Sequence, residues 1–111
     1  MPAKYRLSRT DFTRMRGFKR VHGTLFSLSF GSIPERIVPG AACVVSAKTA
    51  ARATARNRIK RLCRTALAPI MRELKSPLVL VVVAKKPATA ASSAETREEL
   101  LSLLRKASII S

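Results

Sequence analysis

The chain has 111 residues, 47% of them hydrophobic, which fits one domain over residues 1–111 with a single modest core. Its 22 Lys and Arg residues outnumber 6 Asp and Glu residues, and the resulting net charge of +16, spread along the whole chain, predicts a folded domain that binds nucleic acid. No stretch approaches the ~18–20 apolar residues of a membrane span and Met1–Arg9 lacks the apolar middle of a signal peptide, so we expect a cytoplasmic protein without a membrane partner.

The first half of the chain predicts one short helix followed by two strands. Ser8 and Asp11 have the spacing of a capping box, so a helix is expected over about residues 9–16. Alternating apolar residues predict a half-buried strand over 24–30, and a second apolar run predicts a strand over 40–46.

The second half predicts a long helix, a central strand and a final helix. The long helix is expected from about residue 53 towards residue 74, with a kink or local break at Pro69. The β-branched run 78–84 is typical of a strand buried on both faces, and Ser92 and Glu95 form a second capping box. The order α-β-β-α-β-α predicts a two-layer α/β sandwich, of the α+β kind, with a mixed central sheet.

The start of the long helix is the most basic part of the chain. At helical spacing Ile59, Leu62, Ala66 and Ile70 fall on one stripe, which we expect to be buried. Like charges on the rest of the helix repel, so helix stability alone explains them poorly, although an ordinary solvated basic face remains the alternative. The candidate RNA-binding residues are Arg56, Asn57, Arg58, Lys60, Arg61 and Arg64.

The sequence offers no group suited to catalysis. Metal-assisted cleavage needs converging carboxylates, and the six available here are dispersed or explained by helix starts, so neither a catalytic nor a metal-binding residue is predicted. Cys43 and Cys63 lack partners at metal-ligand spacing and are expected to be small buried hydrophobes. Phe12 is a candidate platform for stacking a base of single-stranded RNA, with an ordinary core position as the alternative.

Residues 56–64 read RNRIKRLCR and resemble the RNRxKRxxR signature of the bacterial ribonuclease P protein subunit. Four other landmarks resemble this family in the same order: Arg6-Leu7 with Asp11-Phe12, Gly23 with Phe26-Ser27-Leu28, Val45-Ser46-Ala47-Lys48, and Ala84-Lys85-Lys86-Pro87. The resemblance therefore extends over nearly the whole chain.

The resemblance implies a fold like the second domain of ribosomal protein S5, with a left-handed crossover around the basic helix, against the usual rule. It also implies that a separate catalytic RNA, one per protein, cleaves the 5′ leader from precursor tRNA with Mg²⁺ held mainly by RNA and substrate. Carried over by motif, the basic residues 56, 58, 60, 61 and 64 would contact the catalytic RNA and the nearby leader. The leader cleft would be bordered by Phe12, Lys48, Asn57 and Lys60.

The chain departs from the family pattern in its aromatic residues. The family commonly has an aromatic where this chain has Arg16, and often another where it has Ser29. The hairpin between Gly23 and Phe26 also looks shortened. A basic structural ribosomal protein would satisfy the same compositional arguments and differs only in lacking these landmarks. A third alternative is a freestanding protein nuclease, which would cleave without any added RNA.

Overall fold

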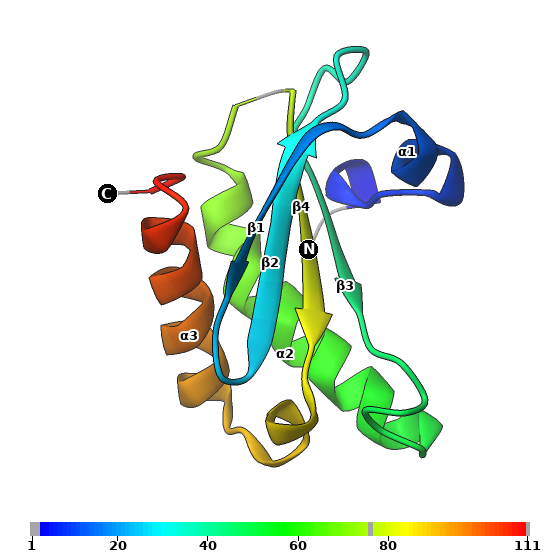
Figure 1. Cartoon of the computed structure of the whole chain (residues 1–111), viewed down its shortest axis with the longest axis vertical. Helices are drawn as coiled ribbons and strands as arrows, with labels where there is room; N and C mark the ends of the chain where they lie inside the picture. The colour runs from blue at the N-terminus through cyan, green and yellow to red at the C-terminus, as the bar shows by residue number, and fades with distance from the viewer. Residues whose placement is uncertain (1–2, 76, 111) are drawn as a thin grey trace.

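The computed structural model describes residues 3–75 and 77–110, which form a four-stranded sheet with two long helices on one face (Figure 1). The elements follow the chain as η1 (Ala3–Tyr5), α1 (Arg9–Arg14), β1 (Arg16–His22), β2 (Phe26–Ser32), β3 (Gly40–Val44), α2 (Ala53–Met71), β4 (Leu78–Ala84), η2 (Lys86–Ala90) and α3 (Ser93–Lys106). The predicted class, a two-layer sandwich with a mixed sheet, is confirmed.

The sheet has the order β1-β2-β4-β3, and only β3 and β4 pair in parallel. Helix α2 connects these two parallel strands. In Figure 1 both strands run downward, β4 lies to the left of β3 and α2 passes behind the sheet, which makes this crossover left-handed, as the resemblance implied. The expected central strand is confirmed, because β4 lies between β2 and β3.

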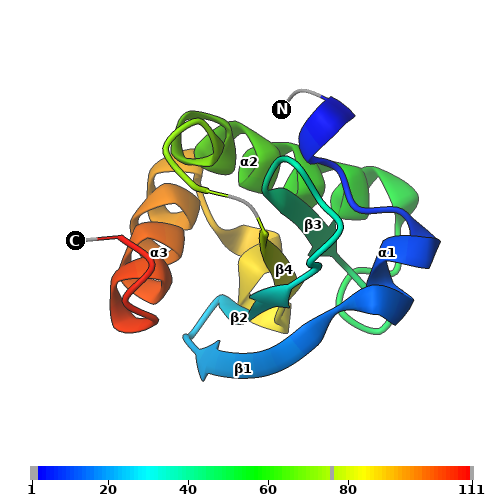
Figure 2. The same ribbon diagram turned by 90° about the horizontal axis from the view of Figure 1, so that it is seen from above.

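The core lies between the sheet and the two long helices, which Figure 2 shows on the same side of it. The buried stripe predicted for α2 is confirmed at Ile59 and Ile70 and is displaced by one residue between them. Leu62 and Ala66 are only half-buried, whereas the fully buried side chains of the helix include Cys63 and Leu67. The helix also continues through Pro69 to Met71. The difference arises because Leu62 and Ala66 line an open hollow between α2 and the start of α3, whereas Cys63 and Leu67 face the core.

The sequence analysis missed β1, so the observed order contains one strand more than predicted. This edge strand carries three cations and no regular alternation of apolar residues. Helix α1 ends at Arg14, earlier than expected, and the chain enters β1 through an irregularity at Gly17, which adopts φ +65°. A left-handed residue in a strand is typical of a β-bulge, in which two residues oppose one on the partner strand.

The N-terminal segment continues the sheet beyond β3. Arg6 forms an isolated parallel bridge with Ala41, and the backbone N–H of Leu7 donates to the Ala41 carbonyl at 3.3 Å. One edge of the sheet is thereby partly covered, and α1 is brought next to β3 (Figure 2).

The carboxylate of Glu99 on α3 holds the tight β1–β2 hairpin. It accepts hydrogen bonds from the backbone N–H groups of Thr24, Leu25 and Phe26, at 3.0, 2.7 and 2.6 Å. The hairpin is as short as expected, since the Gly23 N–H donates to the Phe26 carbonyl at 2.8 Å. A Cβ atom at residue 23 would lie 2.9 Å from the carboxylate carbon, so glycine permits the close approach.

We predict that Glu99→Ala will lower the free energy of unfolding by about 2 kcal/mol or more, because three backbone donors lose a charged acceptor. Urea unfolding followed by circular dichroism measures the change. Glu98→Ala is the matched control, since this exposed neighbour on the same helix makes none of these bonds. Equal stability of the two variants would contradict the role given to Glu99.

Candidate nucleic-acid interface

The buried side of α2 decides where each residue of the basic motif lies. Ile59, Cys63 and Leu67 face the core, so Asn57 and Arg61 are left exposed on the opposite side of the helix. These two side chains are the part of the motif that is most open to a large partner.

Arg56 and Arg58 are half-buried and donate to backbone carbonyls. Nη1 of Arg56 lies 2.9 and 2.8 Å from the carbonyl oxygens of Ala50 and Ala51, in the turn that precedes α2. Nη2 of Arg58 lies 3.0 Å from the carbonyl oxygen of Ala91, just before α3. Both arginines therefore tie α2 to neighbouring segments, in addition to any contact they make with RNA.

Lys60 and Arg64 lie on the flank of α2 that faces β3. Their effect is visible at Cys43, whose pKa is lowered first by a hydrogen bond with the thiol of Cys63 and also by the charges of Arg64 and Lys60. The same hydrogen bond and burial raise the pKa of Cys63. Cys63 is buried as expected, whereas Cys43 is only half-buried.

Phe12, Val44 and Arg64 line a hollow of about 220 Å³ between α1, β3 and α2. Phe12 is 40% exposed and Val44 is 39% exposed, so both offer apolar surface to solvent beside Arg64 of α2. The alternative in which Phe12 belongs to the core is therefore wrong. An exposed ring next to a cation is an arrangement that suits a stacked base with its phosphate.

The other three residues predicted for the cleft lie elsewhere around it. Lys48 is exposed in the turn that follows β3, and Asn57 is exposed on the outer side of α2. Neither they nor Lys60 is among the described residues that line the hollow. Val44 was not predicted, because an apolar residue near a strand end has no feature in the sequence that distinguishes it from the core.

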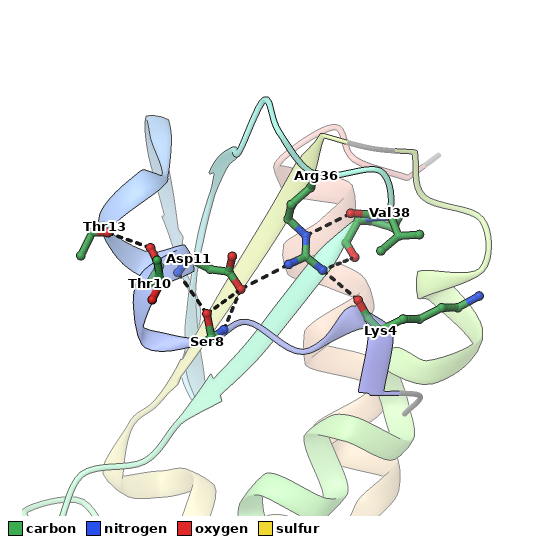
Figure 3. A network of polar contacts seen from close by, with 8 residues as sticks. Lys4, Ser8, Thr10, Asp11, Thr13, Arg36 and Val38 are labelled. Carbon is green, nitrogen blue, oxygen red and sulfur yellow. Dashed lines mark hydrogen bonds and ion pairs between the residues drawn. The ribbon is translucent and has the colours of Figure 1, made fainter.

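Arg36, in the loop between β2 and β3, contacts α1, the helix that carries Phe12 (Figure 3). The Arg36 guanidinium donates to the carbonyls of Val38, Pro39 and Lys4 at 3.0, 3.3 and 2.9 Å. Nη1 of Arg36 also lies 3.3 Å from a carboxylate oxygen of Asp11. One side chain thus joins the β2–β3 loop, the N-terminal segment and α1.

Asp11 also completes the predicted capping box of α1. It accepts from the Ser8 backbone N–H at 2.7 Å, while the hydroxyl of Ser8 accepts from the Asp11 N–H at 3.2 Å. The bond from the Ser8 N–H contributes most to lowering the pKa of Asp11, and the charge of Arg36 acts in the same direction. The capping box of α1 and its attachment to the loop therefore share one carboxylate.

Within the part of the chain that the structure describes, no three His, Cys, Asp or Glu side chains gather as a metal site would require. No helix among the described residues is long and apolar enough to cross a membrane. The fold and this surface define a basic α+β protein that presents cations and an exposed aromatic along one side of the helix in its parallel crossover.

Comparison with known proteins places this class in a family. The model of the family described as Ribonuclease P matches residues 1–108, so the chain belongs to the ribonuclease P protein family. Membership implies an RNA partner and a place in tRNA processing. A search of curated proteins found no match.

Solved structures of similar shape support the fold. The chain resembles the RNase P protein from Staphylococcus aureus with a TM-score of 0.83 and 23% identity, covering 96% of this chain and 98% of that chain. It resembles the RNase P protein from Thermotoga maritima with a TM-score of 0.75 and 25% identity, covering 91% and 96%. The left-handed arrangement around α2 is thus embedded in an architecture that solved RNase P proteins share.

We predict that Arg36→Met will loosen α1 while leaving the sheet intact. Hydrogen exchange of the backbone amides in residues 9–14 should accelerate, whereas exchange in β2 and β4 should stay as in the unchanged protein. The titration midpoint of Asp11, followed by NMR, should start below the ordinary value of about 3.9 and rise in the variant.

The lowered pKa of Asp11 determines how the stability of the protein changes with pH. The stabilisation by Asp11 is present above about pH 4 and is lost as the pH falls through the folded-state pKa. Arg72→Met, at an exposed arginine next to the C-terminal end of α2, is the control. If both variants left exchange in α1 unchanged, Arg36 would have no positioning role.

Proposed function

We propose that this chain is the protein subunit of bacterial ribonuclease P, which assists a catalytic RNA in removing the 5′ leader of precursor tRNA. The observation that carries the proposal is the hollow in which the exposed ring of Phe12 lies beside Arg64 of the RNR helix. The family match over residues 1–108 supports it, and so does the net charge of +16.

The surface suggests two kinds of RNA contact. Asn57 and Arg61, exposed on the outer side of α2, suit contact with the folded catalytic RNA. The hollow, which Arg64 lines from α2, suits a single-stranded leader, whose unpaired bases can stack on Phe12. Lys60 lies one turn before Arg64 on the same flank of α2 and adds a charge near it. Lys48 adds a charge near the end of β3.

The chemical step belongs in this proposal to the RNA and to Mg²⁺ that RNA and substrate hold. The protein would supply affinity and orientation, which raise the rate without a protein group touching the scissile bond. The rival function as a structural ribosomal protein would explain the charge, but it gives no reason for an exposed aromatic beside the RNR helix.

The test of the proposal is reconstitution. We expect the purified protein alone to leave precursor tRNA intact, and cleavage to require the catalytic RNA from the same organism together with Mg²⁺. Asp11→Ala, Glu35→Ala and Glu73→Ala should all retain turnover in the reconstituted complex. Cleavage by the protein alone, or loss of turnover in a folded, RNA-binding carboxylate variant, would contradict RNA catalysis.

The two kinds of arginine in the motif should separate in a salt titration. Arg61→Ala should reduce the slope of log affinity for the catalytic RNA against log salt by about 0.7–0.9, one phosphate contact, with an unchanged melting temperature. Arg58→Ala should instead lower the melting temperature, because its bond to the Ala91 carbonyl is lost. If the slope were the same for Arg61→Ala as for the unchanged protein, Arg61 on the outer side of α2 would not contact a phosphate of the catalytic RNA.

Phe12→Ala should weaken binding of precursor tRNA by roughly 1–3 kcal/mol if a base stacks on the ring. The loss should appear with a leader of several nucleotides and shrink when the leader is cut to one nucleotide. Dissociation constants of the reconstituted complex measure it, after circular dichroism has shown an unchanged melting temperature. An equal loss with both leaders would place the leader elsewhere.

A further inference from the structure

The only two cysteines of the chain meet between the sheet and the helices. Cys43 belongs to the edge strand β3 and Cys63 to α2, and their thiols are in hydrogen-bonding contact although they lie far apart in sequence. Cys63 is part of the hydrophobic core, and Cys43 packs against that core from its border. The fold thus brings all the thiol chemistry of this chain to one place.

The two thiols differ in their access to solvent. Cys63 is only 1% exposed, whereas Cys43 is half-buried and lines the same hollow as Phe12 and Arg64. This hollow, of about 220 Å³, gives a small solute a path to Cys43 and leaves Cys63 behind it. A reagent that enters from water therefore meets Cys43 first.

The surroundings of the pair favour the thiolate form at Cys43. Its pKa is lowered first by the hydrogen bond with the Cys63 thiol and then by the charges of Arg64 and Lys60, which act against burial. The same hydrogen bond and burial raise the pKa of Cys63. Because the thiolate is the nucleophile, Cys43 is the sulfur that attacks and Cys63 is the sulfur in position to react next.

The position of Cys43 on the sheet also permits a covalent bond to α2. Such a bond requires the two sulfur atoms to approach to about 2.05 Å, closer than two thiols in contact. Among the described residues, β3 has β4 as its strand partner on one side, and on its other side the bridge from Arg6 is at Ala41. The strand can therefore shift towards α2 at Cys43 while its pairing with β4 persists.

We propose that Cys43 and Cys63 form an oxidation site, a dithiol that hydrogen peroxide converts into an intramolecular disulfide between β3 and α2. In the first step the Cys43 thiolate attacks one peroxide oxygen, the O–O bond breaks, and Cys43 becomes a sulfenic acid while hydroxide leaves and is protonated to water. In the second step the sulfur of Cys63 attacks the sulfenic sulfur, the S–O bond breaks, and the thiol proton leaves with the hydroxyl as a second water. The two thiols give up two electrons, which the peroxide takes up.

The disulfide would join two walls of one hollow, since β3 carries Val44 and α2 carries Arg64. A dithiol reductant reverses such a bond by exchange, so the state of the pair would follow the redox state of its surroundings. This inference goes beyond the proposed function and does not depend on it, because none of its steps needs RNA.

The experiment treats the reduced, folded, full-length protein with hydrogen peroxide. We expect both thiols to disappear together, and peptide mapping by mass spectrometry to find Cys43 linked to Cys63 within one chain. Dithiothreitol should restore both thiols. The oxidised protein should melt about 5 °C or more above the reduced protein, because the bond closes a loop in the unfolded chain.

Two single variants test the order of the steps. In Cys63→Ala, the sulfenic acid at Cys43 has no second thiol and should accumulate, where dimedone traps it. In Cys43→Ala, the buried Cys63 should stay reduced under the same treatment. Circular dichroism establishes first that each variant is folded, and the link in the unchanged protein remains the deciding result if one of them is not.

Several results would overturn the proposal. These are disulfide-linked dimers in place of the internal link, two thiols that stay reduced, and a link that forms in urea but not in the folded protein. A lower melting temperature after oxidation would show that the bond distorts the fold. Oxidation of Cys63 in Cys43→Ala as fast as that of Cys43 in Cys63→Ala would exclude the hollow as the route of the oxidant.

Discussion

The arrangement of the molecule depends on one constraint: α2 must bury one side against the sheet while it carries five cations between residues 56 and 64. Burial of Ile59, Cys63 and Leu67 fixes the rotation of the helix, and with it the direction of every charged side chain. Arg56 and Arg58 then fall close to backbone carbonyls, whose dipoles partly offset their charge. The remaining cations point to solvent or to β3, which turns a helix with strong internal repulsion into a surface with defined directions.

Two charged side chains attach the segments that secondary structure leaves loose. Arg36 fixes the N-terminal segment and α1 to the β2–β3 loop, and Glu99 fixes the β1–β2 hairpin to α3. Each charge meets several backbone groups at once, which is the condition under which a partly buried charge stabilises a fold. The exposed ring of Phe12 therefore stands on a helix whose attachment depends on polar contacts as well as on the core contact of the nearby Tyr5.

The regular parts of this fold could be predicted from the sequence because local patterns determine them. The continuous apolar run of β4, the capping boxes at Ser8 and Ser92, and the length of α2 were all visible before the structure. Strand β1 was not, since its pairing with β2 depends on the hairpin contact with Glu99, far away in sequence. The Phe12 hollow was predicted in part: the ring and the helix were identified, but Val44 and the role of Arg36 arise only from packing.

The bridge between Arg6 and Ala41 constrains the order in which parts of the structure can form during synthesis. Strand β3 has its sheet partner in β4, which is made only when most of the chain has been synthesised. The N-terminal segment, made first, has to wait for that edge before it can dock. In a partly synthesised chain, α1 and its Phe12 therefore have no strand edge against which to pack. The hollow between α1, β3 and α2 is among the last features to form. The surface that Phe12 and Arg64 form together is in this way restricted to chains that have completed their sheet.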